Sequence, residues 1–122
     1  MTVVEIVQPG PWLAINDRHH FAVRAARTKA WRHAAAVYAL NQGAQPVEGR
    51  VEVHAVIHKP TRVHYDLDGA AATVKACVDG LRDAGVIPAD DTSVVARLVV
   101  TPGEVGKPGR VVVTVTQIGE AA

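Results

Sequence analysis

The chain of 122 residues predicts a single α+β domain in which a mixed sheet is packed by two helices. Four runs rich in β-branched residues are bounded by Pro or Gly, as strands are. Two longer stretches without Pro place apolar residues at helical spacing. The expected element order is β-α-β-α-β-β. Residues 1–122 should form one domain, because a chain of this length buries a single hydrophobic core.

The first half should contain a strand, a helix and a second strand. Residues 2–7 form a β-branched run that ends before Pro9. Residues 21–41 contain neither Pro nor Gly and stop before Gly43, which predicts a helix. Residues 50–59 alternate between apolar and polar up to Pro60, which predicts a half-buried strand. The stripe of the first helix expected to face the core comprises Val23, Ala26, Ala30, Ala34, Val37 and Leu40.

The second half should contain a helix and two strands. The helix is predicted over residues 69–84, and Gly85 ends it. Strands are expected over residues 92–101 and 110–118, separated by a loop rich in Pro and Gly. The apolar stripe of this helix consists of Val74, Cys77, Val78 and Leu81.

Composition and charge narrow the classes of function. The single cysteine, Cys77, excludes an internal disulfide and is expected as a small core residue. Residues 1–11 lack the pattern of a signal peptide, and no run is long enough to span a membrane, so a cytoplasmic protein is expected. Residues 18–47 hold five basic residues and no acid, which by itself is more often a solvated helix face and suits a polyanion partner when taken together with the acidic residues. These five residues are Arg18, Arg24, Arg27, Lys29 and Arg32.

Two acidic pairs flank the second predicted helix. In an extended chain the side chains of Asp66 and Asp68 project to the same side, so both can approach one Mg²⁺ ion. The alternative is that Asp68 only caps the helix. In the second pair, Asp91 is preferred over Asp90 because it lies on the more polar face of the predicted strand, provided that no bulge intervenes.

Lys75 lies about two helical turns after Asp68. Because helical side chains lean toward the N-terminus, Lys75 is expected to reach back toward the aspartates and neutralise a phosphate. The alternative is an exposed ion pair with Asp79, four residues further along the helix.

The order and spacing of three motifs resemble the RusA family of Holliday-junction resolvases. The motifs are Asp66-Leu67-Asp68, the helix Val74-Lys75-Ala76-Cys77-Val78-Asp79-Gly80-Leu81, and Asp90-Asp91 before a strand. The resemblance implies a homodimer without a nucleotide cofactor that uses Mg²⁺, or Mn²⁺, to nick two strands of a four-way DNA junction symmetrically. It also implies that Asp66, Asp68 and Asp91 bind the metal and that Lys75 is catalytic.

The sequence departs from the family pattern at Gly69, where the family has asparagine, and between Asp68 and Lys75, which lie about three residues further apart. Arg62 and His64 replace the arginines that precede the first aspartate, and we expect them to contact DNA together with the basic segment. Two alternatives stay open, a less selective magnesium nuclease and a catalytically silent DNA-binding dimer.

Histidines and tryptophans suggest further roles. Glu52, His54 and His58 share one face of the second predicted strand and His64 follows it, so a zinc site is an alternative to a DNA-facing surface. Trp12 and Trp31 either stack on bases of an open junction or serve in core or dimer packing.

Overall fold

A computed structural model describes residues 1–13 and 20–120 of the chain. It contains a four-stranded mixed sheet and two helices in one small domain, which confirms the predicted α+β class and element order. The helix α1 has the predicted bounds. The elements are β1 (Thr2–Val7), α1 (Phe21–Asn41), β2 (Arg50–His58), α2 (Ala71–Asp83), β3 (Val95–Pro102) and β4 (Arg110–Gly119).

The strand order in the sheet is β1-β4-β2-β3. β4 is antiparallel to both of its neighbours, and β2 and β3 are parallel. β1, β2 and β3 therefore end at the same edge of the sheet, where β4 begins. Two hydrogen bonds hold the chain together at this edge. The Gln8 N–H donates to the Gly109 carbonyl at 2.9 Å, and the Gly103 N–H donates to the carbonyl of Ile57 in β2 at 2.8 Å.

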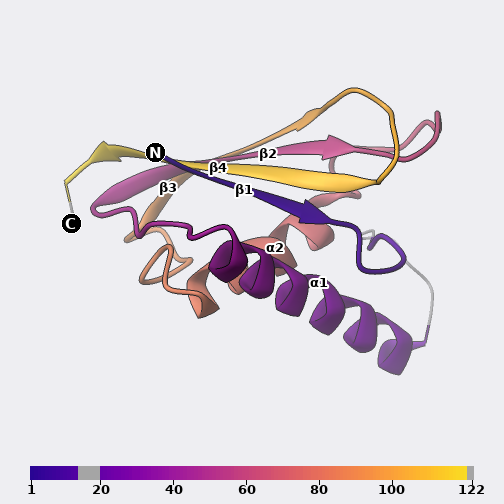
Figure 1. Cartoon of the computed structure of the whole chain (residues 1–122), viewed down its shortest axis with the longest axis horizontal. Helices are drawn as coiled ribbons and strands as arrows, with labels where there is room; N and C mark the ends of the chain where they lie inside the picture. The colour runs from indigo at the N-terminus through magenta and orange to yellow at the C-terminus, as the bar shows by residue number, and fades with distance from the viewer. Residues whose placement is uncertain (14–19, 121–122) are drawn as a thin grey trace.

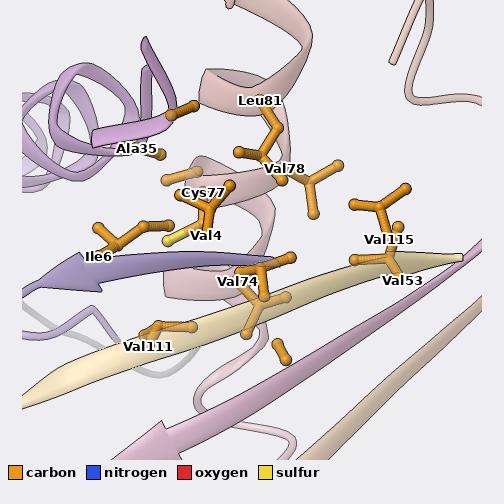
Figure 2. Close-up of a cluster of buried hydrophobic side chains, with 14 of the residues drawn as sticks. Val4, Ile6, Ala35, Val53, Val74, Cys77, Val78, Leu81, Val111 and Val115 are labelled. Atoms are coloured by element: carbon orange, nitrogen blue, oxygen red, sulfur yellow. The ribbon is translucent and has the colours of Figure 1, made fainter. Parts of the chain in front are cut away.

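Both helices lie on the same face of the sheet (Figure 1). The core forms between that face and the helices, and Figure 2 shows side chains of α2 directed at residues of β1, β4 and β2. The predicted apolar stripe of α2 is confirmed, since Val74, Cys77 and Leu81 are fully buried and Val78 nearly so. Burial raises the pKa of the Cys77 thiol to about 12.

The predicted core-facing stripe of α1 is wrong for most of its members. Val23, Val37 and Leu40 are 41%, 37% and 66% exposed. The buried residues of α1 are instead Trp31, Ala34, Ala35 and Ala39. In an alanine-rich helix several faces are apolar enough to be buried, and here the position of Trp31 and the close approach to Gly80 of α2 fix the orientation.

The starts of α2 and β3 differ from the prediction, and both differences affect the predicted aspartate site. α2 begins at Ala71 rather than Gly69, because residues 67–70 form a turn. β3 begins at Val95 rather than Thr92, and its pairing with β2 shifts register between Val51 and Glu52. This bulge reverses the alternation of side chains, so the face assignment that favoured Asp91 does not hold.

In the described ranges 1–13 and 20–120, neither helix combines the length and apolar character that crossing a membrane requires.

Candidate acidic site and nucleic-acid interface

Asp66 and Asp68 lie in and beside the turn that leads into α2. The Ala70 N–H donates to the carbonyls of Asp66 at 3.2 Å and Leu67 at 3.0 Å, and the Ala71 N–H donates to that of Asp68 at 3.2 Å. The N-cap of α2 is Ala70 and has no side-chain cap, so the alternative that Asp68 caps the helix is wrong. Both aspartates are exposed, and neither carboxylate has a hydrogen-bond or ion-pair partner among the described residues.

A surface groove of about 450 Å³ adjoins this turn. It is lined by Arg62, Val63, His64 and Val105. The two predicted DNA-contacting residues of this segment thus line the same concave surface, two to four residues before Asp66. A groove with this lining offers positive charge to a phosphate backbone beside two free carboxylates.

Lys75 points away from the Asp66–Asp68 turn. Its Nζ donates to Asp79 Oδ1 at 2.7 Å and to Asp90 Oδ2 at 2.6 Å. The alternative interpretation, an ion pair with Asp79 four residues along α2, is therefore confirmed, while the expected reach toward Asp68 is absent. These contacts raise the pKa of Lys75, chiefly through the hydrogen bonds with Asp79 and Asp90.

Asp90 and Asp91 are both engaged in local contacts. Arg82 Nη1 approaches Asp90 Oδ1 at 3.1 Å, in addition to the contact with Lys75. A hydrogen bond with the Asp79 carboxyl and the contact with Lys75 hold the pKa of Asp90 well below its usual range. Asp91 Oδ1 accepts hydrogen bonds from the Ser93 N–H at 2.9 Å and from the Ser93 hydroxyl, and these bonds lower the pKa of Asp91.

The two acidic pairs are separated by the topology of the sheet. The turn with Asp91 precedes β3, whose parallel pairing places its start beside Val51, where β2 begins. The Asp66–Asp68 turn follows the opposite end of β2. Consistent with this separation, residues 1–13 and 20–120 contain no group of three His, Cys, Asp or Glu side chains arranged to hold a metal ion. The described residues do not fit a preassembled site formed by Asp66, Asp68 and Asp91.

The predicted basic segment divides into residues with different surroundings. Arg24 and Lys29 are exposed on α1, and Arg27 is half-buried. Arg32 forms a bidentate ion pair with Asp83 of α2, in which the Nε–Oδ2 distance is 2.6 Å and the Nη2–Oδ1 distance is 2.8 Å. Arg32 therefore joins the two helices. Arg18, the remaining predicted DNA contact of this segment, lies outside the described residues.

Two histidines of the alternative zinc site, His54 and His58, have separate partners. His54 Nε2 lies 2.9 Å from the Thr101 hydroxyl, and His58 Nδ1 lies 2.8 Å from the Glu104 carbonyl. Glu52 pairs with Arg97 at 3.2 Å. These contacts hold the side chains apart from one another along β2, so nothing in this arrangement supports zinc.

The two tryptophans pack together, as the core interpretation predicted. Their ring centroids are 4.9 Å apart, and the Trp31 Nε1 donates to the Pro11 carbonyl at 3.0 Å. The sequence interpretation missed that Lys59 lies over the ring of Trp12, although a lysine directly after a strand and beside Arg62 was a usable signal. It also missed Thr73, whose buried hydroxyl bonds both the N–H and the carbonyl of Leu13.

Comparison with known proteins identifies a related protein but does not indicate an activity. No family model matches the chain. An uncharacterized protein of Xylella fastidiosa (strain Temecula1) is 34% identical over 120 residues, a match that covers 92% of this chain and 76% of that protein. The chain belongs to the same family as this uncharacterized Xylella protein.

Proposed function

We propose that this protein is a homodimeric DNA endonuclease of the RusA type that cuts four-way junctions with the aid of Mg²⁺ or Mn²⁺. The order β-α-β-α-β-β with its mixed sheet is compatible with the resemblance of the three motifs in the sequence. Asp66 and Asp68 are the proposed metal-binding and catalytic carboxylates. The resemblance also assigns Asp91 to the metal and Lys75 to catalysis, and both would have to leave their present partners to join the site.

The observation that carries the proposal is the pair of unpartnered carboxylates that follow, in the chain, a groove lined in part by Arg62 and His64. Asp66 and Asp68 are exposed and without partners in the described part of the chain, whereas Asp79 and Asp90 are neutralised by basic side chains. Free carboxylates next to a phosphate path repel the phosphates unless a cation lies between them. Magnesium sites commonly use one or two protein carboxylates and are completed by substrate phosphates.

The residues of the chain itself account for DNA contact. Arg62 and His64 line the groove, and Arg24 and Lys29 extend exposed positive charge along α1. Contacts of this kind bind the backbone without regard to base sequence, which suits an enzyme that recognises the shape of a junction. A two-fold symmetric junction also matches a homodimer, because each subunit can act on one strand.

A catalytically silent DNA-binding dimer is the second candidate, and specific contacts favour it. Asp91 is held by Ser93, and Lys75 is held by Asp79 and Asp90. Lys75 would have to exchange these carboxylates for a phosphate in order to act. Gly69 also lacks the side chain that the resembled family carries beside its aspartates.

Cleavage of synthetic DNA separates these candidates. The purified protein is incubated with a labelled four-way junction and with a matched linear duplex, in Mg²⁺, in Mn²⁺ and in chelator. Asp66→Asn and Asp68→Asn remove one carboxylate each. Glu48→Gln is the matched control, because Glu48 is an exposed acid on the loop before β2, away from the strand ends that carry the groove.

We expect paired symmetric nicks in the junction that need the metal, persist in Glu48→Gln and disappear in Asp66→Asn. Equal cutting of junction and duplex would indicate the less selective nuclease. Tight junction binding without cleavage in either metal would refute the enzyme and support the silent binding protein.

A further inference from the structure

Lys59 is held between two aromatic rings at the edge of the sheet where β2 ends. Its Nζ lies 4.3 Å from the ring centroid of Trp12 and 4.8 Å from that of Tyr65. At these distances the ammonium group is attracted by both rings. Lys59 directly follows β2, and Tyr65 directly precedes Asp66, so this contact links the end of the strand to the acidic turn.

The ammonium of Lys59 has no carboxylate partner among the described residues. Burial lowers the pKa of Lys59, and no neighbouring acid offsets that effect. Lys75 differs in both respects, because two aspartates neutralise it. A partly buried cation without a counterion is a group that gains by binding an anion.

The surroundings of Lys59 fix its position. Trp12 is packed against Trp31, and an added Cβ at Gly109 would lie 3.3 Å from the Trp12 ring and 2.3 Å from Gln8 Oε1. The carbonyl of Lys59 accepts a hydrogen bond from the Gly106 N–H at 3.0 Å. The Trp12 ring and the backbone of Lys59 are thus held in place by their neighbours. Little conformational freedom is therefore lost when the ammonium group binds a ligand.

Lys59 also adjoins the groove described above. Val105 and His64 line that groove, and the residues that follow them in the chain, Gly106 and Tyr65, both contact Lys59. A phosphate seated beside Lys59 is therefore within the same stretch of surface as Arg62 and His64.

The geometry points to Lys59, presented by Trp12 and Tyr65, as a DNA-binding residue that contacts a backbone phosphate next to the Asp66–Asp68 turn. The assignment of this phosphate to DNA rests on the proposed function, whereas the affinity of Lys59 for phosphate does not. Trp12 and Tyr65 act as positioning residues, since they hold the ammonium rather than contact the phosphate.

Two binding measurements in chelator test the inference, and both compare the wild type with Lys59→Gln, Lys59→Arg and Lys107→Gln. Lys107 is the matched control, an exposed lysine on the neighbouring 103–109 loop whose replacement removes the same charge. The first measurement follows tryptophan fluorescence during titration with inorganic pyrophosphate, with Trp12→Phe identifying the reporting ring. The second measures binding of a fluorescent four-way junction as a function of salt.

We expect a saturable fluorescence change on pyrophosphate binding that is lost in Lys59→Gln, kept in Lys107→Gln and largely restored in Lys59→Arg. Junction binding should weaken about tenfold in Lys59→Gln. The slope of log Kd against log salt should decrease by about 1, because one fewer phosphate is neutralised by the protein. Circular dichroism of each variant checks that the fold is intact.

The inference is overturned if Lys59→Gln matches the wild type in both measurements, or if the wild type gives no pyrophosphate response and Lys59→Gln leaves the salt slope unchanged. A pyrophosphate response that needs Lys59 in a protein that neither binds nor cuts the junction would support the phosphate site and refute the proposed function. If the wild type cuts the junction and Lys59→Gln binds it and pyrophosphate as the wild type does, the proposed function is supported and the role of Lys59 is refuted.

Discussion

Gly80 lies where the two helices meet, and replacing it with alanine should destabilise the protein. An added Cβ would lie 2.3 Å from the Arg32 carbonyl oxygen and 2.6 Å from the Ala35 Cβ. Ordinary contacts between such atoms are about 3.5–4.0 Å, so α1 must move by about 1 Å. Both obstacles belong to α1, whose Trp31 and Ala35 are fully buried, and α1 therefore cannot move without disturbing the core.

The magnitude follows from two opposing effects. Overpacking of this kind costs about 1–3 kcal/mol. Alanine is favoured over glycine inside a helix by about 1 kcal/mol, which offsets part of that cost. Because one obstacle is backbone and the other is a short side chain, we expect a net loss of about 1–2 kcal/mol. This loss corresponds to a melting temperature lower by about 4–8 °C for a domain of this size.

Urea denaturation followed by circular dichroism measures the difference in the free energy of unfolding. Gly106→Ala is the matched control, since nothing lies within 4 Å of the added Cβ and the φ angle of Gly106 is not positive. That control should be neutral or slightly stabilising. If Gly80→Ala unfolds at the same urea concentration as the wild type or at a higher one, α1 and α2 do not approach each other closely at Gly80.

Two further predictions concern the polar contacts of α2. Thr73→Val leaves the Leu13 N–H and carbonyl without their buried partner and should lower the free energy of unfolding, measured in urea, by about 1–3 kcal/mol. Thr73→Ser keeps the hydroxyl and should lose less, so equal stability of the two variants would contradict these hydrogen bonds. Asp90 has a lowered pKa in the folded protein, so its contribution to stability is present above the unfolded value near 3.9 and is lost as the pH falls below it. The melting temperatures of wild type and Asp90→Asn should therefore differ most at pH 5, and the gap should narrow as the pH is lowered to 2.5; a gap that does not depend on pH would count against this linkage.

The sequence predicted the elements of the fold better than the way they pack. β2 and α2 were predicted with the correct buried faces because strict alternation in one and a narrow apolar stripe in the other each allow one orientation. α1 had correct bounds but the wrong buried face, since alanines surround the helix and the decisive contacts come from Trp31 and from Gly80 on another helix. The bulge beside Val51 is likewise set by pairing between strands and leaves no signal in the local pattern.

The candidate site was predicted in part for the same reason. Arg62 and His64 are close in sequence to Asp66, so their shared surface follows from chain proximity alone. Asp91 depends on how β3 is placed in the sheet, and its engagement by Ser93 depends on a turn that the sequence interpretation assigned to a strand. The side chain of Lys75 could extend toward Asp68 or toward Asp79, because sequence spacing permits both contacts, and in the structure it contacts Asp79 and Asp90.

Strand direction explains why Lys59 and the acidic turn lie at the same edge of the sheet. β1, β2 and β3 all end at that edge, so the loops that carry Trp12, Lys59 and the acidic turn meet there, whereas the turn with Asp90 lies where β2 and β3 begin. At the latter end Asp90 is paired with Lys75 and Arg82, which α2 supplies. At the strand-end edge, Lys59 is held by aromatic rings instead of a carboxylate, and Asp66 and Asp68 have no described basic partner. Because Lys59 has no carboxylate partner among the described residues, it is available to a polyanion, so an anionic ligand should bind across the strand ends rather than along α2.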